Sequence, residues 1–252
     1  MRQSLLPLIA CSLGLALAGC AASDTRDTEE SEAAIDPFES FNRKMYALNM
    51  SVDKVALKPI AKGYKRFVPS PMRRGFANIF TNFRAPGSAV NNFLQGKPKR
   101  GFNELGRFLF NSTLGIGGIF DVATAGGMER HEENFSQTLA VWGLPEGPYL
   151  VLPVLGPHSL LDAAGVPLDY YADLNTHLTA GVKDRLYLFR LVDARARLLA
   201  ADTLLDSSND PYVTLREAYL QNREFAVYDG EPPEDPDFLE EELFEDFFED
   251  DD

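Results

Sequence analysis

The chain has 252 residues, of which 45% are hydrophobic and 25% charged, a balance that excludes a chain disordered or fibrous as a whole. Its two cysteines, Cys11 and Cys20, lie at the start, which excludes a disulfide framework or a cysteine-built metal site in the body. The formal net charge of −14 comes from one end. Residues 229–252 hold 14 acidic and no basic residues, whereas residues 20–228 hold 24 acidic and 23 basic ones.

Residues 1–19 have the pattern of a secretory signal peptide. A basic residue, Arg2, precedes an apolar run from Leu5 to Leu17 that is too short to cross a bilayer. Leu17-Ala18-Gly19-Cys20 is similar to a lipobox, which implies cleavage before Cys20 and its acylation. An ordinary signal peptide with an incidental cysteine is the alternative.

Acylation predicts a membrane location, because more than one acyl chain anchors a protein stably. By the sorting rule of enteric-type lipoproteins, Ala21 rather than Asp after the cysteine points to the outer membrane. Residues 20–35 are rich in Ser, Thr, Asp and Glu, so we expect an acylated, solvated tether.

The body, residues 36–228, is predicted to be mainly helical. Asp36-Pro37-Phe38-Glu39 predicts a helix start capped by Asp36, with apolar residues at spacings of three and four as far as Val55. A second helix is predicted from Ser70, and a third around 102–109. Two more are predicted over 188–199 and 215–226, the last after a turn at 209–211.

The segment 142–161 has a different composition from the predicted helices. It is apolar and is interrupted by repeated Pro and Gly residues, among them Gly143, Pro145 and Gly147, which forbid a long helix. A short apolar hairpin or loop is predicted there. The acidic tail, 229–252, mixes Phe with Asp and Glu; we expect disorder, with a partner-docking peptide as the alternative.

Three groups of residues suggest chemistry but favour structural roles. Gly115-x-Gly117-Gly118 fails the spacing of a nucleotide-binding loop and favours close packing or a bend. His131 among Glu129, Glu132 and Glu133 matches no metal-binding motif and favours a solvated turn. His158-Ser159 near Asp162 lacks a nucleophile elbow. We therefore predict no catalytic residue, no metal and no cofactor.

Basic residues alternate with aromatic ones between Lys58 and Phe76. In a cytosolic protein this pattern would suggest nucleic acid, but an exported lipoprotein rarely meets it. Membrane-surface binding fits better, with rings at the acyl boundary and cations at the headgroup phosphates; a solvated basic face is the alternative.

Several segments resemble the MlaA/VacJ family of outer-membrane lipoproteins, and together they extend over most of the chain from Asp36 to about Tyr228. They are DPFESFNRKMY at 36–46, NNFLQG at 91–96, RFLFNSTLGIGGIFDVA at 107–123, the Trp-Gly, Gly-Pro-Tyr and Leu-Pro elements of 142–153, and the Asp-Pro-Tyr and Arg-Glu-Ala-Tyr elements of 210–219.

The resemblance implies a non-enzymatic function in outer-membrane lipid asymmetry. Family members remove mislocalised phospholipids from the outer leaflet and pass them to a soluble periplasmic carrier, with trimeric porins as partners. The implied fold is a ring of amphipathic helices in the inner leaflet of the outer membrane, around a polar channel. Two alternatives stay open: a structural lipoprotein that assists porins without moving lipid, and a periplasmic lipid hydrolase.

The resemblance also implies site residues. Asn49 and Met50 stand where the family has an Asn-Phe pair associated with channel control, so the ring of the second residue is missing here. Gly143, Pro145 and Gly147 fall in the family's hairpin loop bordering the channel, and Pro145 replaces a glycine. The headgroups that pass, the direction of movement and the role of the tail are left open.

Overall fold

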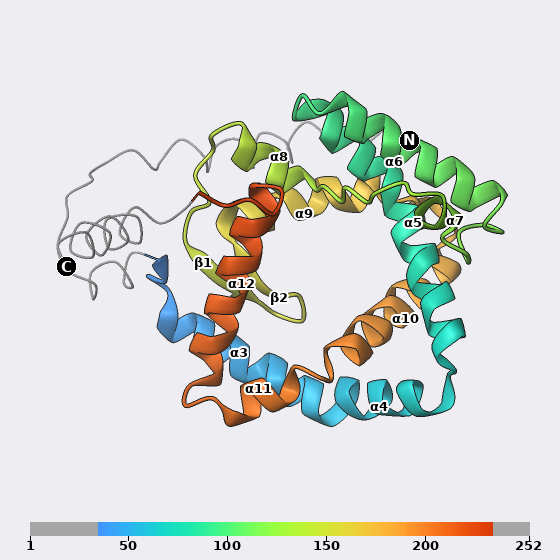
Figure 1. The fold of residues 1–252 in the computed structure, drawn as a ribbon. Coiled ribbons are helices and arrows are strands. Elements are labelled where there is room, and N and C mark those ends of the chain that lie inside the picture. The colour runs from blue at the N-terminus through green and yellow to red at the C-terminus, as the bar shows by residue number, and fades with distance from the viewer. Residues whose placement is uncertain (1–34, 234–252) are drawn as a thin grey trace, which may run out of the picture.

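A computed structural model describes residues 35–233 of the chain. The predicted signal peptide, Cys20, nearly all of the predicted tether and most of the acidic tail lie outside the described residues. Within them the chain forms helices and one short hairpin arranged around a central opening (Figure 1). None of the described helices combines the length and apolar character needed to cross a membrane.

The mainly helical prediction for the body is confirmed. In chain order the described elements are α3 (Glu39–Val52), the π-helical turn η1 (Asp53–Leu57), α4 (Lys58–Phe67), α5 (Ser70–Leu94), α6 (Pro98–Thr113), α7 (Val122–Ala125), α8 (Phe135–Val141), β1 (Tyr149–Leu152), β2 (Gly156–Ser159), α9 (Leu160–Ala172), the 3₁₀ turn η2 (Leu174–His177), α10 (Ala180–Leu198), α11 (Asp202–Ser207) and α12 (Pro211–Val227).

The predicted capping of the first helix by Asp36 is wrong. The helix begins at Glu39, and the N-cap residue before it, Phe38, makes no side-chain capping hydrogen bond. The Asp36 carboxylate instead accepts hydrogen bonds from Asn42 Nδ2, at 2.7 Å, and from the Tyr212 hydroxyl. The side chain that the local sequence predicts to cap the helix therefore binds residues of α3 and α12 instead.

The first helix is also longer than predicted, because the chain stays helical to Phe67 through the π-turn η1. Pro59 has no N–H to donate within a regular helix, and η1 lies directly before it. The amide of Lys58 bonds the carbonyl of Asp53, five residues back. In η1, the buried Asp53 carboxylate accepts hydrogen bonds from the Arg195 guanidinium of α10 at 2.7 and 2.9 Å, which ties η1 to α10.

The predicted apolar hairpin is confirmed as β1 and β2, an antiparallel pair in which Tyr149 faces Ser159 and Leu152 faces Gly156. Its turn places Val154 at φ 67°, a left-handed conformation that a β-branched residue rarely adopts. In Figure 1 the hairpin extends from the α12 side of the ring toward the central opening.

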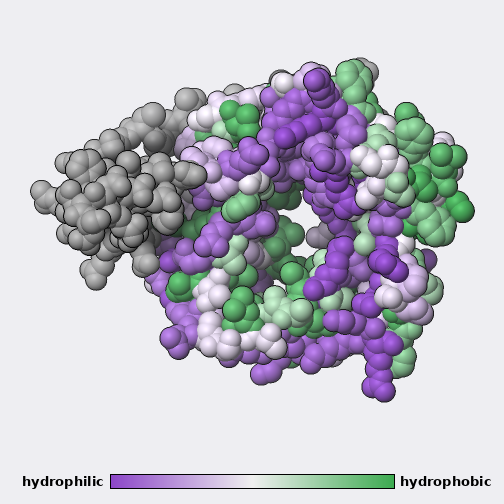
Figure 2. Space-filling view, in the orientation of Figure 1, coloured by the Kyte–Doolittle hydropathy of each residue, from purple (hydrophilic) through white to green (hydrophobic). Residues whose placement is uncertain are grey.

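The distribution of side chains is inverted relative to a water-soluble globule. Among the described residues, 11 hydrophobic side chains are buried, against 20 polar or charged ones, whereas 37 large hydrophobic residues are exposed. Figure 2 shows the molecule hollowed at its centre, with apolar residues gathered at the outer edge near α6 and α7. Exposed apolar residues of that region are Phe102, Leu109, Phe110, Leu114, Ile116, Ile119 and Phe120.

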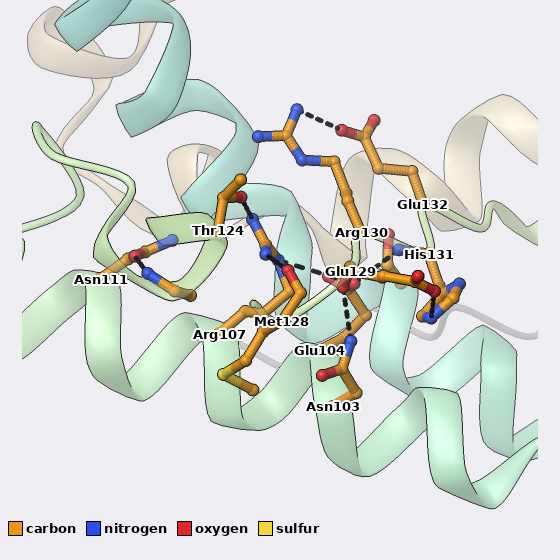
Figure 3. A network of polar contacts seen from close by, with 12 residues as sticks. Asn103, Glu104, Arg107, Asn111, Thr124, Met128, Glu129, Arg130, His131 and Glu132 are labelled. Carbon is orange, nitrogen blue, oxygen red and sulfur yellow. Dashed lines mark hydrogen bonds and ion pairs between the residues drawn. The ribbon is translucent and has the colours of Figure 1, made fainter. Parts of the chain in front are cut away.

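Part of the polar interior lies between α6 and α7, where buried Arg107 of α6 binds residues before, within and after α7 (Figure 3). Its guanidinium donates to both carboxylate oxygens of Asp121, at 3.0 Å each, to Thr124 Oγ1 at 3.0 Å and to the carbonyl of Met128. Burial raises the pKa of Asp121, but hydrogen bonds from Thr124 and Asn111 and the charge of Arg107 outweigh this and bring the pKa below its ordinary value.

Arg107 should therefore be far more important for stability than Arg130, which also pairs with Asp121 at 3.0 Å but has a side chain 40% exposed. We expect Arg107→Met to lower the free energy of unfolding by about 3–5 kcal/mol, because it leaves buried Glu104 without its cationic neighbour and removes the buried guanidinium from Asp121. Arg130→Met should cost less than about 1 kcal/mol. Urea unfolding of both variants in one detergent, followed by circular dichroism, tests this; equal losses would contradict it.

The predicted role of Gly115 in close packing gives a second test. A Cβ at Gly115 would overlap the backbone carbonyl oxygen of Phe120, whereas a Cβ at Gly63 in α4 would meet nothing. Gly115→Ala should destabilise the fold by about 1–3 kcal/mol, because the backbone must shift. Gly63→Ala should stabilise it by about 0.5–1 kcal/mol, as expected in an open helix. Thermal melts showing the same sign for both would refute this.

Candidate functional site

The central opening contains a cavity of about 560 Å³. It lies between α5, α9, η2 and α10, and the tip and second strand of the hairpin contribute Leu155 and His158. The volume is in the range of small-molecule sites. The ionisable residues of its wall are Arg84, Glu133, His158, Asp162, Asp169, Asp173, Lys183, Asp184 and Arg190.

The cavity wall also contains apolar and aromatic groups, among them Val166, Tyr170 and Tyr187. Lys183 Nζ donates to the Tyr170 hydroxyl at 3.0 Å and lies 5.7 Å from the centre of that ring. This hydrogen bond raises the pKa of Lys183, so the side chain is positively charged at neutral pH. The wall therefore offers both apolar and charged groups to a ligand.

The hairpin is fixed to α3 by two asparagines that lie two helical turns apart. Asn42 Nδ2 donates to the Tyr149 carbonyl at 3.0 Å, and Asn42 Oδ1 accepts from the Val151 amide at 2.9 Å. Asn49 repeats the arrangement, donating to the Leu152 carbonyl at 2.9 Å and accepting from the Val154 amide at 2.8 Å. The two side chains thus substitute for a strand along the free edge of β1.

A buried polar cluster fixes the other end of the hairpin. Ser159 Oγ donates to Glu146 at 2.6 Å, and the Tyr219 hydroxyl of α12 accepts from the Ser159 amide at 2.5 Å. Arg223 donates to Glu146 at 3.0 Å and to Ser136 Oγ at 2.9 Å. The base of the hairpin is thereby tied to both α8 and α12, while Leu155 of the turn and His158 of β2 line the cavity.

The histidines form no catalytic arrangement with Ser159. His158 Nδ1 lies 3.2 Å from the carbonyl of Gly156, whereas Ser159 Oγ binds Glu146 and accepts the Asp162 amide at the start of α9. His131 lies 4.0 Å from Glu129, and its backbone amide donates to buried Glu104 at 2.7 Å. No group of His, Cys, Asp and Glu able to hold a metal ion occurs between residues 35 and 233.

The structure brings only part of the predicted site together. Asn49 binds the hairpin turn, but Met50 is 37% exposed and does not line the cavity. Gly143, Pro145 and Gly147 precede β1 and lie outside the cavity wall, with both glycines at positive φ.

The charged wall of the cavity was missed by sequence reasoning. Arg84, Asp169, Lys183 and Asp184 come from three helices, and no motif links them. The one local signal was the presence of charged residues within amphipathic helices, which is equally typical of a solvated face. Tyr64, predicted within the membrane-facing basic segment, is buried and donates to Asp193 at 2.9 Å.

Comparison with protein families gives one match, to the MlaA lipoprotein family over residues 34–226. The intermembrane phospholipid transport system lipoprotein MlaA of Escherichia coli strain K12 is 38% identical over 92% of this chain and 93% of that protein. The protein of the same name from Haemophilus influenzae is 34% identical over 94% of this chain and 96% of its own.

A solved structure from work on the structural basis for maintenance of bacterial outer membrane lipid asymmetry is also similar. It is 38% identical, has a TM-score of 0.69, and covers 76% of this chain and 98% of its own. An uncharacterised protein of Rickettsia typhi is 36% identical over 76% of this chain and 78% of that protein.

The two asparagines of α3 should contribute unequally to stability. Asn42 is fully buried, so Asn42→Ala leaves two main-chain groups of β1 without partners and should cost about 2–3 kcal/mol. Asn49→Ala should cost about 1 kcal/mol, because the exposed turn can bind water instead. Chemical denaturation in detergent measures both, with Asn222→Ala as an exposed asparagine control; a larger loss for Asn49→Ala would contradict the prediction.

Proposed function

The chain belongs to the MlaA lipoprotein family, and we propose that it removes mislocalised phospholipids from the outer leaflet of the outer membrane. In this proposal the lipids pass through the polar opening of the ring and leave to a soluble periplasmic carrier, which maintains lipid asymmetry. The similar proteins of Escherichia coli and Haemophilus influenzae are lipoproteins of an intermembrane phospholipid transport system. No bond is made or broken in this process, so the protein acts without catalysis.

The observation that carries the proposal is the inverted distribution of side chains. Large apolar residues are exposed along α3, α4, α5 and α6, whereas the buried interior is mostly polar. In water such a surface would aggregate, but acyl chains solvate it favourably. A ring that is apolar outside and polar inside is suited to lie in one leaflet and to hold a wet passage for headgroups.

The membrane location follows from the same features. We infer that the domain of residues 36–228 lies in the inner leaflet of the outer membrane, anchored by acylated Cys20 through the tether of residues 20–35. Phe67 is 79% exposed at the end of α4, with the Arg66 guanidinium 5.8 Å from the centre of its ring. This pairing suits the boundary between acyl chains and headgroup phosphates.

The hairpin supports a role in controlling the passage. Asn49 binds the turn whose residue Leu155 lines the cavity, so movement of α3 at this point would be transmitted to the lining. We propose that Asn49 and Met50 control the opening, and that Gly143, Pro145 and Gly147 set the direction in which the hairpin leaves α8. A trimeric porin is the proposed partner that holds the ring in the membrane.

Deletion of the gene should raise the phospholipid content of the outer leaflet several-fold, because the route out of that leaflet is lost. A membrane-impermeant amine-reactive label on intact cells measures this, and sensitivity to detergent with chelator is the second readout. The full-length chain should restore the barrier, whereas Cys20→Ser should not, because it lacks the acylation site. An unchanged outer leaflet in a clean deletion would count against the proposal.

The same strains separate the alternatives. A lipid hydrolase would lose function when His131, His158 and His177 are all replaced by Gln, whereas the proposed transporter should restore the barrier in that form. A structural lipoprotein that only assists porins would change porin abundance while leaving outer-leaflet phospholipid unaltered.

A further inference from the structure

We propose that the cavity selects phospholipids whose headgroup carries both a phosphate and a primary ammonium group, over phospholipids whose headgroup has a net negative charge. This inference rests on the proposed function and concerns which lipids occupy the passage. It follows from the charges of the wall that remain once internal ion pairs are removed.

Several charges of the wall are already matched by the protein. Arg190 donates to Asp173 at 2.7 Å. Asp162 accepts from Ser136 and from the Tyr219 hydroxyl, with Arg223 at 3.7 Å. Lys97 donates to Glu133 at 3.3 Å. These groups leave little charge for a ligand.

Two cationic and two anionic residues remain more open to a ligand. Arg84 of α5 has only a long contact, 3.8 Å, with Glu132, and Lys183 of α10 binds a neutral hydroxyl. Asp184 makes no hydrogen bond or close ion pair among the described residues, although its charge acts on neighbouring Lys183. Asp169 of α9 accepts one backbone amide, that of Phe135, at 2.8 Å. Equal numbers of both signs match a zwitterionic headgroup.

The two signs face the same space. Burial raises the pKa of Asp169, and the nearby charge of Arg84 partly opposes this, so these two side chains influence each other across the cavity wall. Arg84, Lys183, Asp169 and Asp184 all line the one cavity, so a headgroup inside it is exposed to charges of both signs. Cationic side chains favour the phosphate through charge-assisted hydrogen bonds, and carboxylates accept N–H groups of the ammonium in the same way.

An unpartnered acceptor in the wall supports a donor on the ligand. Asn175 is 4% exposed and lines the cavity, and its Oδ1 atom has no hydrogen-bond partner. Buried amide oxygens are normally satisfied, so one without a partner calls for a donor. A primary ammonium has three N–H donors, and the hydroxyl groups of a glycerol headgroup can also donate, so this acceptor favours a headgroup with a donor while the choice between the two headgroups depends on the carboxylates.

An anionic headgroup meets a different balance. It would satisfy Arg84 and Lys183 but leave half-buried Asp169 and exposed Asp184 without a counter-charge, and the cost falls mainly on Asp169. Unpaired charges removed from water are costly. The preference should therefore depend on the two carboxylates, while binding of any phospholipid should depend on the two cations.

The test uses the purified, acylated full-length protein in vesicles of equal amounts of phosphatidylethanolamine and phosphatidylglycerol. A photoreactive amino acid replaces Leu155, which lines the cavity, or Val55, which is 81% exposed on the outer surface. Mass spectrometry then gives the ratio of the two captured lipids. We expect a ratio several-fold above one at position 155 and close to one at position 55.

Variants assign the preference. Asp184→Asn and Asp169→Asn should lower the ratio at position 155 toward one, whereas Asp206→Asn, on exposed α11 outside the wall, should leave it unchanged. Asp184 is exposed and makes no hydrogen bond among the described residues, so its variant keeps the test valid if Asp169→Asn fails to fold. Arg84→Gln with Lys183→Gln should lower total capture at position 155.

The outcomes separate the inference from the proposed function. Capture of both lipids at position 155 with a ratio of one would overturn the headgroup preference and leave the transport proposal standing. A preference unaffected by Asp184→Asn and Asp169→Asn would also overturn it. Absence of phospholipid at position 155, with capture at position 55, would overturn the proposed function and the inference together.

Discussion

Hydrogen bonds from side chains of one segment to the main chain of another hold this fold together. Asn42 and Asn49 bind β1, Gln137 of α8 donates to the carbonyl of Ala226 at 2.9 Å, and Trp142 Nε1 donates to that of Leu94 at 3.0 Å. The constraint arises because the large apolar side chains face outward and form only small internal clusters. In surroundings of low dielectric constant such bonds are stronger than in water, and leaving one unmade is correspondingly costly.

A ring with an opening follows from this arrangement. A hydrophobic core would draw the helices together over the centre, since its contribution grows with the apolar area removed from water. Polar bonds act at points, so α5, α9 and α10 can be fixed at their crossings while the space between them stays open as a cavity of about 560 Å³. A few of the buried polar residues, Glu133 and Asp173 among them, also line that cavity.

The sequence was sufficient for features that depend on local chemistry. Proline and apolar spacing predicted the helix from Ser70, and the Pro- and Gly-rich segment predicted the hairpin, because both signals act within a few residues. The role of Asp36 could not be predicted from the neighbouring sequence, because Asn42 of α3 and Tyr212 of α12 bind its carboxylate. The cavity wall could not be predicted for the same reason: Arg84, Asp169 and Lys183 meet only once distant helices are in place.

The hairpin combines a fixed base with a turn that is held by one side chain. Its base is fixed by Tyr219 and Glu146, and β1 is fixed by Asn42, so the strands themselves have little freedom. The turn differs: Val154 is held at positive φ, and Asn49 bonds the main chain on either side of Pro153. A backbone conformation that is unfavourable for valine is maintained by a side chain two helical turns beyond Asn42, so any change in α3 at Asn49 releases the turn first. The control proposed for Asn49 therefore acts on the tip beside Leu155, whereas β2, which contributes His158 to the cavity wall, is held in place by the fixed base.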